Sequence, residues 1–126
     1  MAGSIPARGA TYRQKENMLL IVREKASAEV LQKVAEDLDG YVKVVVDVRH
    51  KILSAGGKLH VDGEKLLLQD GSKQADLWGG GIDFESGEID FDSMINLRPS
   101  QNNPSREVLD QGIRKQVESI IRDLLR

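Results

Sequence analysis

A histidine and two acidic residues occupy alternate positions in the middle of this 126-residue chain: His60, Asp62 and Glu64. Imidazole and carboxylate groups are ligands of zinc, manganese and iron, and they also carry protons in acid–base catalysis. On a strand the three side chains would share one face, whereas at a helix start they would diverge. Asp76 is a further candidate ligand, because the polar stretch after Gly71 could fold it back. The resulting hypothesis is a divalent-metal site at His60, Asp62 and Asp76.

The simpler interpretation of this stretch is structural. Asp62 and Glu64 suit the first turn of a helix, where their charges lie near the positive end of the dipole, and His60 then belongs to a loop. The weak spacing favours this interpretation over metal or acid–base chemistry. Asp62 would cap a short helix that ends at Asp70–Gly71, and the competing prediction is that residues 59–62 continue a strand.

A second group of polar side chains follows the last predicted strand. Asn96, Arg98 and Gln101 carry amides and a guanidinium, which can hold a carboxylate or phosphate through two parallel hydrogen bonds. The alternative is a polar loop whose amides satisfy the turn backbone. Trp78 is expected to anchor the core, and the functional alternative makes it the wall of a pocket beside His60. The candidate ligand-binding residues are therefore His60, Asp62, Glu64, Asp76, Trp78, Asn96, Arg98 and Gln101.

Composition and missing motifs exclude several classes of function. The sequence has no cysteine, so disulfides, thiolate metal sites and a cysteine nucleophile are excluded. It lacks the glycine-rich phosphate loops, the nucleophile elbow and the helical zinc-protease motif. The formal net charge of −2 argues against a nucleic-acid partner. No apolar run approaches the ~20 residues that span a bilayer, so no membrane partner is expected. The choice between an enzyme and a binding protein stays open.

Hydrophobic periodicity predicts the elements that must hold these side chains. Alternating valines at 42–48 indicate a strand, and the stripe through Ile113 and Val117 indicates an amphipathic final helix. In chain order the pattern predicts a strand at 19–22, a helix from Ser27 to Gly40, a hairpin at 41–48 and 52–55, the helix after Asp62, a hairpin at 78–85 and 88–98 with a Ser86–Gly87 turn, and a helix from Asp110. The predicted class is α+β: an antiparallel sheet from two β-hairpins plus an N-terminal strand, with helices packed on one face, in the order β-α-β-β-α-β-β-α.

Length and composition indicate one domain. A chain of 126 residues is the size of one domain. Residues 1–17 show no apolar period, and we expect a disordered tail or an upstream extension there, with Met18 as the natural start. Residues 18–126 are then a single α+β domain. The glycine run 79–81 lies inside a strand pattern, which predicts a bulge or a close backbone approach.

Several segments occur in a specific order: VVDV (45–48), GGKLHVDGE (56–64), LLQDGS (67–72), DLWG (76–79), INLRP (95–99) and the closing helix from Ile113. Over residues 18–126 this order resembles a family of small prokaryotic proteins known only as a domain of unknown function. The resemblance implies a stand-alone cytoplasmic domain and supports the short helix after Asp62, and it implies no activity. Gly63 stands where such relatives would carry alanine, which predicts a late or frayed start of that helix.

Two functional hypotheses follow from these patterns. The first is a non-enzymatic binding or interaction module that forms a homo-oligomer, with Val45 and the edge of the glycine-rich strand pairing with a second copy. The second is a small-ligand or divalent-metal pocket, with hydrolase-like chemistry as its catalytic form. In it, Arg98 would hold an anionic group while His60 or Glu64 moves a proton. This second hypothesis requires the histidine–acid stretch and the amide-rich segment to meet across one hollow.

Overall fold

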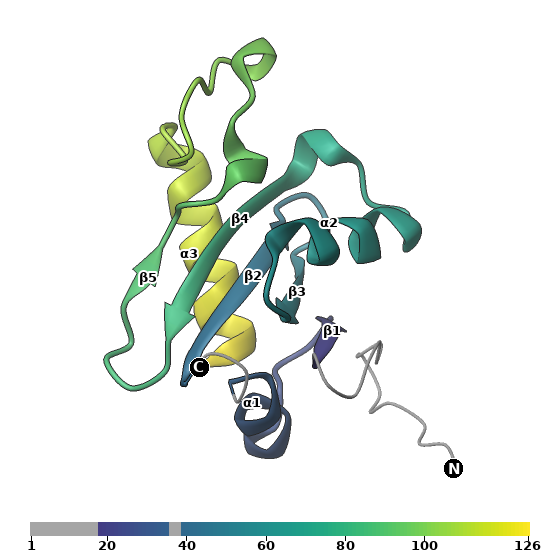
Figure 1. Cartoon of the computed structure of the whole chain (residues 1–126), viewed down its shortest axis with the longest axis vertical. Coiled ribbons are helices and arrows are strands. Elements are labelled where there is room, and N and C mark those ends of the chain that lie inside the picture. Colours follow the sequence, from purple (N-terminus) through teal and green to yellow (C-terminus); the bar gives the residue numbers. More distant parts are fainter. Residues whose placement is uncertain (1–17, 36–38) are drawn as a thin grey trace.

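A five-stranded antiparallel sheet organises residues 18–35 and 39–126, which are the residues that the computed structural model describes (Figure 1). Its strands are β1 (Leu19–Val22), β2 (Tyr41–Asp47), β3 (Ile52–Gly56), β4 (Leu77–Asp83) and β5 (Ile89–Asp90), in the spatial order β1-β3-β2-β4-β5. The helices are α1 (Ala28–Val34), α2 (His60–Gln69) and α3 (Gln111–Leu125), with short 3₁₀ turns η2 (Gln74–Asp76), η3 (Met94–Asn96) and η4 (Pro99–Gln101). The α+β class and the predicted element order are confirmed.

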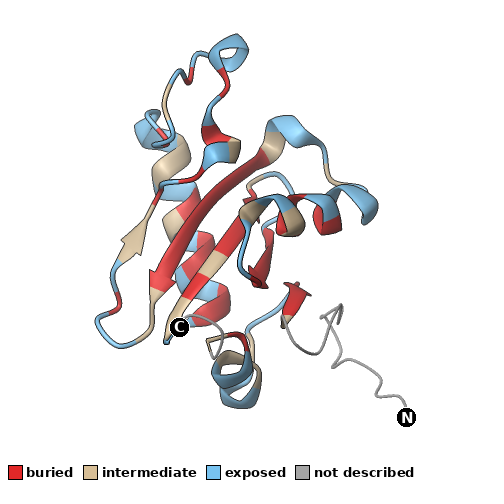
Figure 2. Cartoon of the chain, in the orientation of Figure 1, coloured by how far each residue is buried: buried red, intermediate tan, exposed pale blue. Residues whose placement is uncertain are grey.

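Helices cover both faces of the sheet, so the expectation that they pack on one face is wrong. Val44 and Val46 of β2 point to the side where α3 packs and join a cluster that includes Val117. Val45 points to the other side and packs with Leu67 of α2. The central strands are apolar on both faces and therefore need cover on both. Figure 2 shows buried residues along β4 and along most of β2.

Helix α2 confirms the predicted helix, but it begins at His60, before Asp62. The N-cap residue is Leu59, whose side chain cannot accept a hydrogen bond, so Asp62 is not the cap and contributes its charge near the helix start. The expected late start at Gly63 is wrong, since Gly63 is buried inside the helix. A Cβ there would overlap the hydroxyl of Ser54, so the bare glycine lets α2 lie directly on β3. The helix ends at the predicted Asp70–Gly71 stop.

The second hairpin is shorter than predicted. β5 pairs with β4 at only two positions, and the connection is the loop 84–87 instead of the two-residue Ser86–Gly87 turn. The side chain of Asp83 accepts hydrogen bonds from two backbone N–H groups of that loop, which stabilises the longer connection. The predicted strand through Arg98 is wrong, because Ser93 Oγ accepts a backbone N–H two residues on and starts η3.

Two further expectations concern the sheet edge and the chain ends. Val45 is 1% exposed beneath α2, and β4 lies between β2 and β5, so the surface expected to pair with a second copy is internal. The homo-oligomer stays a prediction, which sedimentation of the full chain would test. The expected tail at 1–17, and residues 36–38 of the first predicted helix, lie outside the described residues. No helix in the described ranges is both long and apolar enough to cross a membrane.

Candidate functional site

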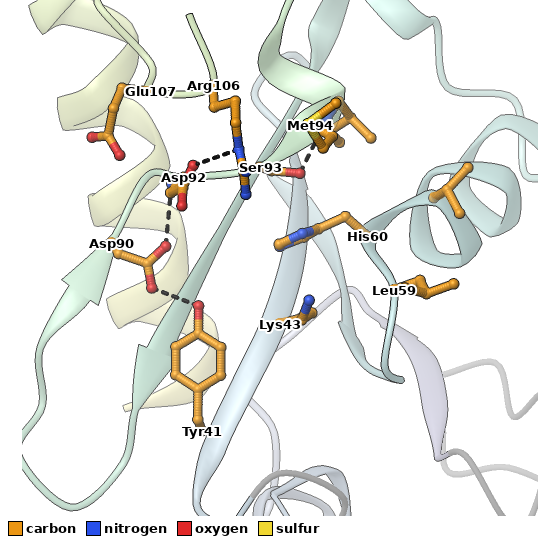
Figure 3. A pocket seen from close by; sticks show the side chains of 12 residues that line it. Tyr41, Lys43, Leu59, His60, Asp90, Asp92, Ser93, Met94, Arg106 and Glu107 are labelled. Atoms are coloured by element: carbon orange, nitrogen blue, oxygen red, sulfur yellow. Dashed lines mark hydrogen bonds and ion pairs between the residues drawn. The ribbon is translucent and has the colours of Figure 1, made fainter.

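A hollow of about 550 Å³ opens on the sheet face that α2 covers only in part. Helix α2 packs over β1, β3 and the middle of β2. The first half of β2 lies beside the N-terminus of α2, and its residues Tyr41 and Lys43 line the hollow there. We call this hollow the His60 pocket (Figure 3). Its polar lining residues are Tyr41, Lys43, His60, Asp90, Asp92, Ser93, Arg106 and Glu107.

The backbone of Gly81 lies beneath Tyr41, one of the residues that line the pocket. Gly81 of β4 lies between Lys43 of β2 and Asp90 of β5 in the strand register, and directly paired residues face the same side. The ring of Tyr41 lies over Gly81, and its hydroxyl donates a hydrogen bond to Asp90 Oδ2 at 2.5 Å. A Cβ at Gly81 would overlap that hydroxyl. A Cβ at Gly80 would overlap the backbone carbonyl oxygen of Asp90, so the close backbone approach predicted for the glycine run 79–81 is found there.

Tyr41 is a neutral hydrogen-bond donor in this pocket. Burial of the phenol raises its pKa above the ordinary value, because the phenolate would lose its hydration. The hydrogen bond to Asp90 and the negative charges of Asp90 and Asp92 raise the pKa further. Tyr41 therefore keeps its proton at neutral pH and holds the Asp90 carboxylate in place at the side of the pocket.

His60 is held as one tautomer. Its Nε2 lies 2.7 Å from the carbonyl oxygen of Gly80, and a carbonyl only accepts, so Nε2 carries the hydrogen. Burial lowers the pKa of His60 and the positive charge of Lys43 adds to this, outweighing the Gly80 carbonyl and the acidic residues Asp90 and Asp92. The ring is therefore neutral at neutral pH, and Nδ1 presents a lone pair that accepts no hydrogen bond from any described residue.

The charged groups of the pocket differ in how far they are already paired. At the rim, Arg106 Nε lies 3.2 Å from Asp92 Oδ1, and Arg114 lies 3.6 Å from Glu107. Lys43 forms no ion pair with a described residue, and Figure 3 shows its ammonium directed into the pocket below His60. Lys43 and the His60 Nδ1 atom are thus the groups that a bound molecule would meet without first breaking a contact.

Four of the residues predicted from the sequence form a separate cluster. Arg98 donates to the carbonyl oxygens of Gln74, at 2.7 Å, and Leu77, and to Gln101 Oε1 at 3.2 Å. Its guanidinium carbon lies 4.0 Å from the centroid of the Trp78 ring. Burial lowers the pKa of Arg98, and the negative charge of Glu64 opposes the shift. The guanidinium therefore joins η2, β4 and η4, which is a structural use of its donors.

Asn96 is likewise bound to the backbone. It is fully buried, its Oδ1 accepts from Gly79 N at 2.8 Å, and its Nδ2 donates to Gly79 O at 3.0 Å. Further bonds from Nδ2 reach the carbonyls of Phe91 and Arg106 at 3.0 Å. These contacts match the alternative in which the amides of this segment satisfy turn backbone. They also fix the chain that carries Asp92 and Arg106 beside the pocket.

The structure brings only some of the eight candidates together. His60 lines the pocket, Glu64, Trp78, Arg98 and Gln101 belong to the cluster around Arg98, and Asn96 is bound to the backbone of β4. Trp78 is 3% exposed and is not a pocket wall. Asp62 and Asp76 line neither place. Within 18–35 and 39–126, no three histidine or acidic side chains converge as a metal site would require, so His60, Asp62 and Asp76 are not brought together. Within the amide-rich segment, Arg98 lies close enough to Glu64 to feel its charge. The residues of η3 that line the pocket with His60 are Met94 and Ile95.

Sequence reasoning did not single out Tyr41, Lys43, Asp90, Asp92 and Arg106. A signal was present for the first two, since they alternate with the buried valines of β2 and so point to the opposite face. That Asp90 lies across from them depends on the pairing of β2 with β4 and of β4 with β5, which the alternation alone does not define.

The fold and the site define an α+β domain with a central antiparallel sheet, helices on both faces and a polar pocket beside α2. Residues 20–124 match the family described as "Protein of unknown function (DUF5674)", and the chain belongs to this family. No curated protein and no solved structure matches the chain. The match confirms the resemblance to a domain of unknown function.

Proposed function

We propose that this domain is a binding module for a small zwitterionic molecule with an apolar side chain, and that the His60 pocket is its site. One observation carries the proposal: Lys43, His60, Asp90 and Asp92 line one hollow, and among the described residues the Lys43 ammonium has no ion-pair partner and His60 Nδ1 accepts no hydrogen bond. A ligand carboxylate would lie at Lys43. A ligand ammonium would lie at Asp90 and Asp92 and would donate to His60 Nδ1.

The apolar part of the ligand follows from the remaining lining. Leu59, Val61 and Met94 line the pocket and are 57%, 43% and 61% exposed. Exposed apolar side chains beside convergent polar groups are typical of ligand sites, and a volume of 550 Å³ lies within the usual range of about 300–1,000 Å³. An aliphatic α-amino acid combines the three required features: a carboxylate, an ammonium and a branched apolar group.

Three probes of equal shape test the proposal. Leucine carries both charges, isocaproate lacks the amino group, and isoamylamine lacks the carboxylate. Isotope-labelled full-length protein is titrated with each probe, and the backbone amide signals of Lys43, His60, Gly80 and Asp90 are followed by NMR. We expect saturable shifts with leucine and much weaker ones with the two single-charge probes, because each of these leaves one set of pocket charges without a partner.

The matched control uses two lysines. Lys43→Met removes the pocket ammonium, whereas Lys115→Met removes an exposed ammonium on α3, outside the His60 pocket. The first variant is expected to lose the leucine response and the second to keep it. No saturable response to leucine, or an equal response in Lys43→Met and wild type, would contradict the proposal.

The hydrolase-like alternative uses the same pocket and rests on His60. A neutral imidazole with a free Nδ1 can take a proton from a bound water or hydroxyl. Its test is release of nitrophenol from nitrophenyl acetate, compared between wild type and His60→Gln. Equal rates in the two proteins would show that His60 does not transfer a proton in this reaction and would contradict the hydrolase-like alternative.

A further inference from the structure

A second histidine is held by a buried carboxylate at the turn between β2 and β3. Asp47, the last residue of β2, is 0% exposed. Its Oδ1 accepts from the backbone N–H groups of Arg49 at 2.9 Å and His50 at 3.0 Å. Its Oδ2 lies 2.7 Å from His50 Nδ1 and accepts from Ser72 Oγ at 2.6 Å. The carboxylate is therefore fully used and rigidly placed.

The charge of Asp47 is stable in this position. Burial favours the protonated acid and would raise its pKa, but the hydrogen bonds from Ser72 and from the backbone and ring of His50 outweigh it. The pKa of Asp47 thus lies below the ordinary value. An ionised carboxylate only accepts, so His50 Nδ1 carries a hydrogen and the lone pair of the neutral ring lies on Nε2.

The ring of His50 lines a hollow of about 340 Å³. The side chain of His50 is 52% exposed, so its Nε2 edge is open to molecules from solution. Arg23 and Asp70 line the same hollow and form an ion pair at 2.5 Å. That contact uses one terminal nitrogen of Arg23 and balances the charge of Asp70, while the planar guanidinium has further donors of the kind that suit phosphoryl oxygens.

We propose that His50 Nε2 is a nucleophile that accepts a phosphoryl group, with Asp47 as its positioning residue and Arg23 as the group that binds the phosphoryl oxygens. The proposal is independent of the His60 pocket, since the two hollows share no lining residue. The donor class is a small phosphoramidate or acyl phosphate, whose phosphorus carries a good leaving group.

The step balances with phosphoramidate as the donor. The Nε2 lone pair attacks phosphorus, the Nε2–P bond forms, and the P–N bond of the donor breaks. Its electron pair leaves with the nitrogen of the protonated amino group as ammonia. The ring keeps the hydrogen on Nδ1 and becomes cationic, and the adjacent Asp47 carboxylate stabilises this charge. No proton has to be removed from the attacking atom.

The two histidines of the chain, His50 and His60, make the test residue-specific. The full chain is incubated with phosphoramidate and followed by mass spectrometry and phosphorus NMR. We expect one phosphoryl group on Nε2 of His50, absent in His50→Gln and retained in His60→Gln. We also expect labelling at least about tenfold faster than in the urea-unfolded chain, because the folded protein supplies the positioning carboxylate.

Further variants separate positioning from reactivity. Asp47→Asn is expected to slow labelling toward the rate of the urea-unfolded chain, because the carboxylate that orients the ring and stabilises its positive charge is lost. Arg23→Gln changes an exposed side chain and should also slow labelling, because it removes the group that binds the phosphoryl oxygens. As a matched control for Arg23, Arg122→Gln removes an exposed guanidinium on α3, outside this hollow, and should label near the wild-type rate. Labelling on His60, no labelling of the folded chain, or equal rates in the folded and unfolded chains would overturn the proposal.

Discussion

The hydroxyl of Tyr41 on β2 reaches Asp90 on β5 across the whole width of β4, with a hydrogen bond of 2.5 Å. The contact exists because Gly81, the β4 residue between these strands, has no side chain. It links two residues that line the His60 pocket, Tyr41 and Asp90.

Gly81→Ala should displace the Tyr41 ring and destabilise the fold. Overpacking of this kind costs about 1–3 kcal/mol in the free energy of unfolding. Chemical denaturation measures the loss. In a Tyr41→Ala background the same substitution should cost much less, because the clashing ring is gone. An equal cost in both backgrounds would show that Tyr41 is not what Gly81 accommodates.

The ionisation of Tyr41 should occur above the ordinary tyrosine value of about 10. The absorbance titration of wild type minus that of Tyr41→Phe isolates this group, and Asp90→Asn should bring its pKa down. The raised pKa stabilises the fold below the unfolded value of about 10, and this contribution is lost as pH rises above it. Titration of Tyr41 at the ordinary value would contradict the buried geometry.

The imidazole of His60 should titrate below the ordinary histidine value of about 6.5. A lowered pKa means that the unfolded chain binds the proton more readily, so stability falls as pH drops below about 6.5. NMR titration follows the ring, and His50→Gln assigns its signal. Lys43→Met should raise the pKa of His60, since it removes a repelling charge. An unchanged His60 pKa would show that the Lys43 ammonium does not act on the ring.

Arg98 should matter for stability more than for ligand binding. Arg98→Met leaves the carbonyls of Gln74 and Leu77 without their donor, which we expect to cost about 2–3 kcal/mol. Arg106→Met breaks only an exposed ion pair at the pocket rim and should cost within about 0.5 kcal/mol. Urea denaturation compares the two variants. A fully stable Arg98→Met protein would return Arg98 to the ligand-binding candidates.

The periodicity of the sequence predicts the elements well and their lateral arrangement less well. Alternating valines identify β2, and the apolar stripe through Val117 identifies α3. Val45 is buried on the sheet face opposite to Val44 and Val46, so this face also needs a covering layer, which is helix α2. The end of β5 was not predictable, because side-chain bonds by Ser93 and Asn96 to the backbone replace the ladder there.

The candidate site was predictable only at His60. Its partners come from strands that are neighbours in the sheet but distant in the chain, since β3 and α2 lie between β2 and β4 in sequence. Arg98 and Asn96 were identified as hydrogen-bonding groups, and the structure directs those bonds to backbone carbonyls. Residue type alone does not show whether a side chain donates its hydrogen bonds to the backbone or to a ligand, because the same donor groups serve both.

Calorimetric titration of the full chain with leucine tests the central claim most directly. The account predicts saturable heat in wild type and in Lys115→Met, and none in Lys43→Met. Absence of saturable heat in wild type, or an unchanged binding curve after Lys43→Met, would contradict a zwitterion site in the His60 pocket.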